Sequence, residues 1–224
     1  MATFDFLPRT PAGLLRFADA ARTAEHLRGG GLAVLPTETG YLLGAVATDL
    51  DAVRKVFAVK ERDPGNPVHV ACSSIALAAR FAELDDTARD LIARFTPGPL
   101  TVVVPQRDTL PGELVTKDGT VGIRVPDHPA TLQVVELLGS PITATSLNRS
   151  GEESMPLDRG QLETLAWPDG ERVLVLEHDA AITEPSASTL VRVGPDAELT
   201  ILRKGPIDLA ELAGVAGPRR GPAA

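Results

Sequence analysis

Residues 31–39 read Gly31-Leu32-Ala33-Val34-Leu35-Pro36-Thr37-Glu38-Thr39, an apolar run that changes abruptly to a turn-like polar segment. The apolar part has the length and composition of a buried strand. Other strand-like or helical runs are followed by polar segments too, namely Lys60-Glu61-Arg62 with Asn66-Pro67, Arg124-Val125-Pro126, and Ser146-Leu147-Asn148-Arg149-Ser150-Gly151. Because ligands bind α/β sheets at strand ends, we expect these side chains to converge on one phosphate-bearing ligand.

Helical and strand-like patterns alternate through the first two thirds of the chain. We expect a helix from a Thr10 cap and Pro11 to Leu27, and a second that opens at Asp49 or Asp51. Further strands are expected at 68–72, 100–105, 120–125 and 141–145. Two helices are expected within 75–95, with Ser73 or Ser74 as the cap of the first. Another helix is expected at 129–138, with Asp127 as its cap and Gly139 at its end. The pattern predicts an α/β fold.

The last third is richer in strands. Runs at 173–176, 188–193 and 199–202 have no helical pattern between them, which predicts antiparallel strands added to a βα core, and hence a mixed sheet. We expect one domain over residues 10–207, then a C-terminal helix and a disordered tail within 208–224, where Pro and Gly accumulate.

Composition narrows the function classes. The 224 residues are 43% hydrophobic and carry a formal net charge of −8, which disfavours broad binding to nucleic acid or to an anionic membrane. Cys72 is the only cysteine, and the four histidines lack metal-ligand spacing. No apolar run approaches the roughly 20 residues that a membrane span needs, and no leader pattern opens the chain, so we expect a cytoplasmic protein.

The common nucleotide-binding motifs are absent. There is no Gly-x-x-x-x-Gly-Lys-Ser/Thr loop, no Gly-x-Gly-x-x-Gly turn and no Gly-x-Ser-x-Gly elbow. Phosphates would have to bind dispersed side chains such as Lys60 and Arg62, although such a pair at a helix end often only stabilises the helix dipole. Glu38 by itself reads as a surface carboxylate.

The ordered segments together resemble the YrdC-type threonylcarbamoyl-AMP synthase family. They are Pro36–Thr39 with Tyr41, Lys60–Pro67, Pro97–Thr101, Thr120 with Arg124 and Pro126, Ser146–Gly151, Ser188-Thr189, and Arg203 with Gly205. The resemblance covers roughly residues 10 to 207. It implies a twisted sheet of parallel and antiparallel strands with flanking helices and a concave, positively lined cavity.

The resemblance implies a nucleotidyltransferase that condenses L-threonine, bicarbonate and ATP to threonylcarbamoyl-AMP, with release of pyrophosphate. Mg²⁺ would be held by the ATP phosphates and not by protein side chains. The product would pass to a tRNA threonylcarbamoyl-transferase complex that forms t6A at position 37 of tRNA. Weak or no direct binding of tRNA, and no membrane partner, are expected.

The same resemblance implies two groups of site residues. ATP would contact Lys60, Arg62, Asn66, Thr120, Ser146, Asn148, Ser154 and Arg203, with Lys60 and Arg62 as catalytic residues. L-Threonine would contact Thr39, Tyr41, His69, Arg124, Ala144, Ser188 and Thr189.

Four positions depart from the family pattern: Gly40, Leu42, Leu147, and Ala71 in place of a histidine. His69 lies two residues before Ala71, on the same face of a strand, and is a candidate substitute. These departures leave two alternatives open. One is a paralogue that uses another amine or carbamoyl donor, and the other is a non-catalytic module that binds RNA or a nucleotide.

Overall fold

The computed structural model describes residues 1–150, 159–177 and 186–215. In these residues ten strands form one sheet in the order β1-β8-β2-β3-β7-β4-β6-β5-β9-β10. The strands are β1 (Thr3–Leu7), β2 (Leu32–Thr37), β3 (Gly40–Gly44), β4 (His69–Ala71), β5 (Leu100–Pro105), β6 (Thr120–Arg124), β7 (Ile142–Ser146), β8 (Arg172–Leu176), β9 (Thr189–Val193) and β10 (Leu199–Arg203). Parallel and antiparallel pairs both occur, so the predicted mixed sheet is confirmed.

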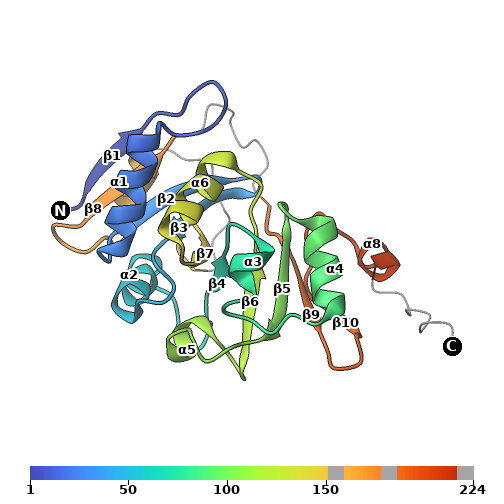
Figure 1. Cartoon of the computed structure of the whole chain (residues 1–224). Coiled ribbons are helices and arrows are strands. Elements are labelled where there is room, and N and C mark those ends of the chain that lie inside the picture. The colour runs from blue at the N-terminus through green and yellow to red at the C-terminus, as the bar shows by residue number, and fades with distance from the viewer. Residues whose placement is uncertain (151–158, 178–185, 216–224) are drawn as a thin grey trace, which may run out of the picture.

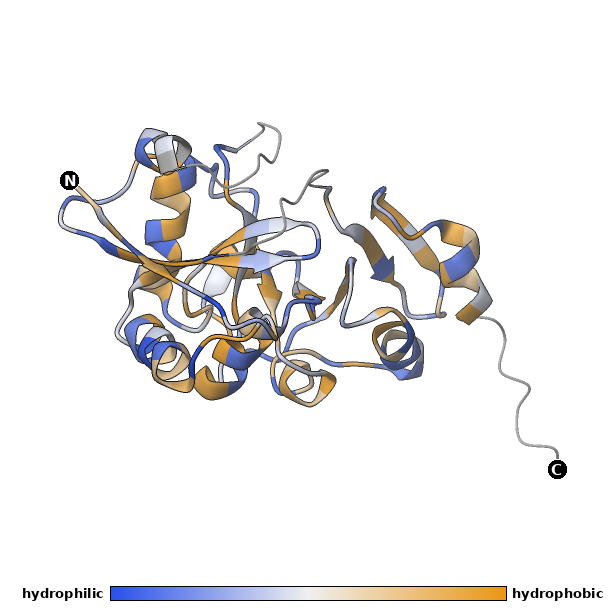
Figure 2. Ribbon diagram, turned by 90° about the horizontal axis from the view of Figure 1, so that it is seen from above, coloured by the Kyte–Doolittle hydropathy of each residue, from blue (hydrophilic) through white to orange (hydrophobic). Residues whose placement is uncertain are grey.

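Helices flank this sheet (Figure 1). They are α1 (Phe17–Arg28), α2 (Leu50–Lys60), α3 (Ile75–Ala78), α4 (Asp86–Phe95), α5 (Gly112–Val115), α6 (Pro129–Leu138), α7 (Arg159–Thr164) and α8 (Leu209–Val215). Seen from above, the strands are largely hydrophobic, whereas the helices carry both hydrophilic and hydrophobic residues (Figure 2). This is the pattern of helices that cover a sheet with one face and meet solvent with the other. No helix of the described residues is long and apolar enough to cross a membrane.

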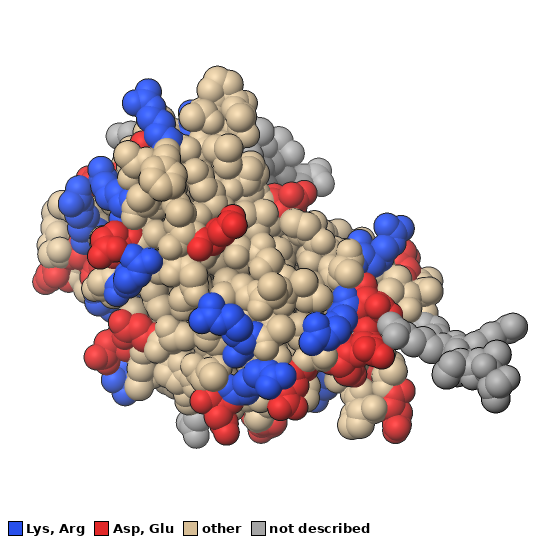
Figure 3. Space-filling model, in the orientation of Figure 1, with Lys and Arg blue, Asp and Glu red and all other residues tan. Residues whose placement is uncertain are grey.

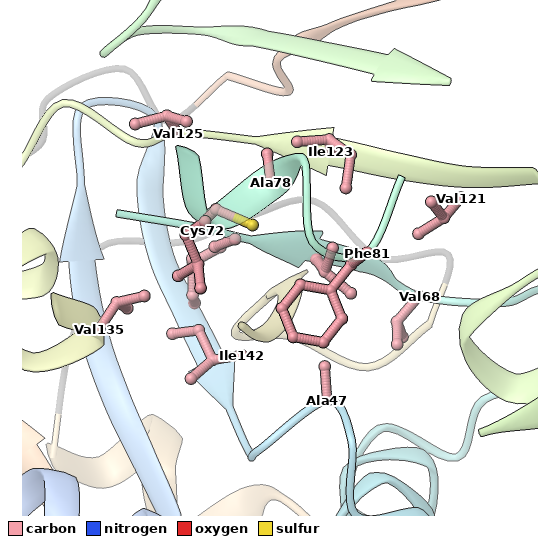
Figure 4. Close-up of a cluster of buried hydrophobic side chains, with 14 of the residues drawn as sticks. Ala47, Val68, Cys72, Ala78, Phe81, Val121, Ile123, Val125, Val135 and Ile142 are labelled. Atoms are coloured by element: carbon pink, nitrogen blue, oxygen red, sulfur yellow. The ribbon is translucent and has the colours of Figure 1, made fainter. Parts of the chain in front are cut away.

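Strand β2 is apolar from Leu32 to Pro36 because both of its faces are covered. Ala33 and Leu35 belong to the larger buried cluster, which includes residues of α1, α3, α4, α6 and α8. Leu32 and Val34 belong to a second cluster with α2 and α7. Since successive side chains of a strand alternate between faces, a run without alternation is typical of a doubly covered strand. Figure 4 shows the larger cluster around Cys72 and Phe81, both buried.

Helix α2 begins as predicted at an Asp49 cap, which places Lys60 in its last turn. The Asp49 side chain accepts the backbone N–H groups of Asp51 and Ala52. Ser74, one of the two predicted candidates, caps α3, and Gly139 ends α6 as predicted, in the left-handed conformation.

Removing the Asp49 cap is expected to lower the free energy of unfolding by about 1 kcal/mol, because two backbone N–H groups lose their acceptor. The measurement is urea denaturation of Asp49→Ala. Asp51→Ala is the matched control. The Asp51 side chain is 87% exposed, and on α2 it pairs only with Arg54. We expect a change below about 0.5 kcal/mol for it. Equal losses of unfolding free energy in Asp49→Ala and Asp51→Ala would contradict the role of Asp49 as the helix cap.

Two predicted helix starts are wrong. Thr10 does not cap a helix, because its N–H and hydroxyl both donate to the Leu14 carbonyl in a tight turn, with Gly13 at φ 77°. Helix α1 begins only at Phe17. At α6 the cap residue is His128 and not Asp127, whose N–H is taken by the Glu38 carboxylate.

The predicted antiparallel pairing of the late strands is correct only in part. Strands β9 and β10 form an antiparallel pair, but β8 is parallel to β1 and β2, and β9 is parallel to β5. Strand β8 lies second from one end of the sheet and β9 second from the other, so the two strands are not neighbours. Strands β1 and β3 were not predicted, and β1 lies before the expected domain start at residue 10. The predicted tail beyond residue 215 lies outside the described residues, and the helix α8 occupies Leu209–Val215.

Candidate functional site

A pocket of about 560 Å³ opens on the central strands of the sheet. Its lining comes from β3, β7, β4, β6, β5 and β10, together with Arg62 after α2 and the segment 186–188 before β9. Most of the predicted site residues meet there: Thr39, Tyr41, Arg62, His69, Arg124, Ala144, Ser146, Asn148, Ser188 and Arg203. Segments from residue 39 to residue 203 therefore build one site.

The strand register explains why the side chains of His69, Ala144, Ser146 and Arg124 share one face. Leu42 pairs with Ser146, His69 with Ala144, and Thr101 with Arg124. Paired residues point to the same side of a sheet, and residues two apart on a strand do so too. The residues between them, such as Val70, Ile123 and Val102, point into the buried core instead. The alternation thus separates a polar pocket from an apolar core.

Arg124 is the most enclosed of the three arginines in the pocket lining. Only 6% of it is exposed, and its Nη2 donates to Glu38 Oε1 at 2.8 Å and to Thr39 Oγ1 at 2.6 Å. Because a buried guanidinium without an acceptor is costly, the ion pair with Glu38 stabilises this placement. The reading of Glu38 as a surface carboxylate is therefore wrong.

Arg203 and Arg62 are held mainly by backbone oxygens, with one side-chain hydroxyl as a further acceptor for Arg203. Arg203 donates from Nε to the Ser188 carbonyl at 3.1 Å and from Nη2 to the Ser188 hydroxyl at 3.0 Å. Arg62 donates to the carbonyls of Asn66 and Pro67 at 2.6 and 3.0 Å. Burial lowers the pKa of both groups, and repulsion from Arg124 and Arg62 lowers the pKa of Arg203 further. An anion bound between the three arginines would relieve this repulsion.

His69 is a neutral imidazole at pH 7. Burial lowers its pKa to about 4, with added repulsion from Arg203, Arg62 and Arg124. The ring lies against Gly122, where a side-chain Cβ would stand 2.2 Å from His69 Nδ1. Gly122 is thus required for the ring to occupy this position.

The pKa of His69 predicts a stability change in mild acid. The unfolded histidine binds a proton below about pH 6.5, whereas the folded one does so only below about 4, so stability falls as pH drops through this window. We expect the free energy of unfolding to fall between pH 7 and pH 5 by about 2 kcal/mol more in the unaltered chain than in His69→Gln. Urea denaturation at the two pH values measures this. The same pH dependence of the unfolding free energy in the unaltered chain and in His69→Gln would contradict the lowered pKa of His69.

Four other predicted site residues are not part of the lining of the described pocket. Lys60 is 1% exposed, and its ammonium donates to backbone and side-chain oxygens of the loop after β7. Asn66 is exposed, and its carbonyl accepts from Arg62. The Thr120 hydroxyl donates to the Lys117 carbonyl, and the buried Thr189 hydroxyl donates to the Ile207 carbonyl. Ser154 lies outside the described residues.

Sequence reasoning missed Thr101, whose hydroxyl shares a 2.7 Å hydrogen bond with Ser188 in the pocket wall. The feature of the sequence that could have pointed to Thr101 is its place at the end of the Pro97–Thr101 family segment. Val68, Thr145, Ser186 and Ala187 were also missed. Of the four departures from the family pattern, Gly40 and Leu42 line the pocket, whereas Ala71 and Leu147 are buried in the apolar clusters.

The fold and the pocket define an α/β protein with an arginine-lined site on the face of a mixed sheet. Residues 25–205 match the Sua5/YciO/YrdC family, described as "Telomere recombination", and the chain belongs to this family. A Mycobacterium leprae protein named putative threonylcarbamoyl-AMP synthase is 35% identical over 201 residues, which are 88% of this chain and 87% of that protein. A Pyrococcus abyssi threonylcarbamoyl-AMP synthase is 41% identical over 133 residues, 58% of this chain and 39% of that protein.

Solved structures agree with the family. P. abyssi Sua5 complexed with L-threonine matches with a TM-score of 0.82 at 29% identity, over 96% of this chain and 61% of that one. Escherichia coli YciO matches with a TM-score of 0.79 at 22% identity, over 95% of this chain and all of that one, which supports the fold alone. The chain thus spans about two fifths of the length of the P. abyssi synthase and three fifths of the solved Sua5 chain.

Proposed function

We propose that this chain is an L-threonylcarbamoyladenylate synthase, a nucleotidyltransferase that condenses L-threonine, bicarbonate and ATP and releases pyrophosphate. The observation that carries the proposal is the pocket in which Arg62, Arg124 and Arg203 gather on one face of the sheet. The relatives named threonylcarbamoyl-AMP synthase, and the similar Sua5 structure that holds L-threonine, support the same activity.

The chemistry explains why such a site suits the reaction. Carboxylation of the threonine amine gives an N-carboxylate, which must attack the α-phosphorus of ATP, so two anions have to meet. Catalysis then depends on aligning them and on compensating their charge. Three guanidinium groups line a pocket of about 560 Å³, which provides both the positive charge and the space that the two anionic reactants need.

The substrates divide between the two sides of the pocket. Arg124 and Thr39, which contact each other, would hold the amino acid together with Tyr41, His69, Ala144 and Ser188. Arg62, Ser146, Asn148 and Arg203 would hold ATP. Lys60 acts in this proposal by fixing the loop that carries Ser146 and Asn148.

Mg²⁺ would arrive on the ATP phosphates. The described residues contain no group of three His, Cys, Asp or Glu side chains that could hold a metal ion, and the described pocket lining includes no carboxylate. Mg²⁺ prefers oxygen ligands and commonly uses substrate phosphates. It would neutralise phosphate charge there, while the arginines orient the polyphosphate.

The product would be consumed by a tRNA threonylcarbamoyl-transferase complex. On the face seen in Figure 3, basic and acidic side chains are interspersed, without a continuous basic surface. Together with the net charge of −8, this supports weak or no direct binding of tRNA.

The test is incubation of the purified protein with ATP, Mg²⁺ and bicarbonate, with and without L-threonine, followed by mass spectrometry of the adenylate and an assay of pyrophosphate. We expect threonylcarbamoyl-AMP only when threonine is present. Equal adenylate formation with other amines, or with carbamoyl phosphate in place of bicarbonate, would favour the paralogue, for which Gly40 and Leu42 in the wall are the supporting observation. No turnover with salt-sensitive RNA binding would favour the binding module.

A further inference from the structure

The turn between β2 and β3 is built to hold Glu38 in one place. The Thr37 hydroxyl donates to the Gly40 carbonyl at 2.7 Å and accepts the Thr39 N–H at 3.2 Å. Thr37 is 1% exposed, so water does not compete for these hydrogen bonds. A turn closed by its own buried side chain leaves little freedom to the residue between.

Both carboxylate oxygens of Glu38 are used, and on separate partners. Oε1 accepts from Arg124 Nη2 at 2.8 Å, and Oε2 accepts the backbone N–H of Asp127 at 2.8 Å. Glu38 therefore contacts both ends of the segment 124–127, which leads from β6 toward α6. The side chains of Glu38 and Arg124 are 20% and 7% exposed, so this pair is far better shielded from solvent than a surface ion pair.

The hydrogen bonds hold Arg124 from one side only. Glu38 and Thr39 both contact Nη2. The Nε atom is buried and has no hydrogen-bond partner among the described residues, although Arg124 lines the pocket. An unsatisfied buried donor costs about 1–3 kcal/mol, which a ligand oxygen would recover.

We propose that Glu38 is a positioning residue for substrate binding: it fixes the guanidinium plane of Arg124 so that the donors not used by Glu38 and Thr39 meet the carboxylate of the amino-acid substrate. The proposal rests on the proposed function for the identity of that substrate. Glu38 and Thr39 accept from both N–H groups of Nη2, so the substrate carboxylate would accept from the Nε or Nη1 donors that remain. A charge-assisted hydrogen bond of this kind needs a defined guanidinium plane as well as charge. Glu38 does not itself touch the substrate.

The placement of Arg124 can be measured without substrate. In protein labelled with ¹⁵N-arginine, the Arg124 signals are assigned by their loss in Arg124→Lys, and the rate at which its two Nη groups exchange reports rotation about the Nε–Cζ bond. We expect Glu38→Gln, which keeps the size of the side chain but removes its charge, to speed this rotation at least about tenfold because a charge-assisted hydrogen bond is weakened. Glu61→Gln is the matched control, since Glu61 is 58% exposed and contacts only Arg149 at 3.8 Å among the ion pairs.

Steady-state kinetics supplies the second readout. In Glu38→Gln we expect the KM for L-threonine to rise at least tenfold, while the KM for ATP changes less than twofold. A general loss of folding would change both KM values.

An unchanged rotation rate of Arg124 in Glu38→Gln would overturn the positioning role, whether or not the chain makes the adenylate. An unaltered protein that forms no threonine-dependent adenylate would instead refute the proposed function, and faster rotation in the variant would still support the positioning of Arg124.

Discussion

Arg62→Ala is expected to lower the rate of threonine-dependent pyrophosphate release at least about 10³-fold. Arg62 is one of three arginines in the lining of the described pocket, and its loss removes a charge-assisted donor where charge accumulates in phosphoryl transfer. The fold is expected to survive, because the carbonyls of Asn66 and Pro67 that lose this donor lie in an exposed or half-buried segment open to water. The measurement is a continuous pyrophosphate assay, with the thermal unfolding midpoint recorded in parallel.

Arg54→Ala is the matched control for Arg62→Ala. Arg54 lies on α2, only eight positions earlier, but its side chain is 62% exposed and pairs with Asp51 away from the pocket. Its replacement is expected to change the rate less than twofold. Undiminished turnover in Arg62→Ala would remove this residue from the site, and a rate loss accompanied by unfolding would assign it a structural role instead.

The fold was predicted best where one local signal acts without competition. The apolar run of β2 and the Asp49 cap of α2 are such signals, and both elements lie where the sequence placed them. Thr10 and Pro11 gave an equally good cap signal, but a left-handed Gly13 two residues later turns the chain back before a helix can begin. The direction of β8 depends on contacts with β1 and β2, which are distant in sequence, so no local pattern could reveal it.

The site residues also divide into those that the sequence could predict and those that depend on contacts distant in sequence. Arg124 and Arg203 were predicted because they stand at positions of the family motifs, and both line the pocket. Thr101 and Glu38 were not predicted as site residues, because a strand threonine and a turn glutamate look ordinary until the strand register places them beside Ser188 and Arg124. The sequence placed Lys60 at the phosphates, whereas the direction of its side chain depends on its acceptors at Ser146, the last residue of β7, and at Asn148, which are 86 and 88 residues away.

Lys60→Met is expected to lower the free energy of unfolding by about 3–5 kcal/mol and to reduce turnover with it. The Lys60 ammonium is buried and donates to the Ser146 carbonyl, to the Asn148 carbonyl at 2.5 Å and to Asn148 Oδ1 at 3.0 Å. Its backbone carbonyl also accepts the Ser150 N–H at 3.0 Å. Methionine fills a similar volume but has no donor, so these buried oxygens would lose their common partner.

Lys55→Met separates this effect from the simple loss of a lysine on α2. Lys55 donates to the Gly30 carbonyl at 2.9 Å and pairs with Glu171, but its side chain is 37% exposed, so we expect a loss below about 1 kcal/mol. Urea denaturation compares the two variants, and the KM for ATP is measured where Lys60→Met still folds. A raised KM for ATP with little loss of stability would show that Lys60 binds the phosphates directly. A large loss of stability shows that its first task is to hold Ser146 and Asn148 in the pocket wall.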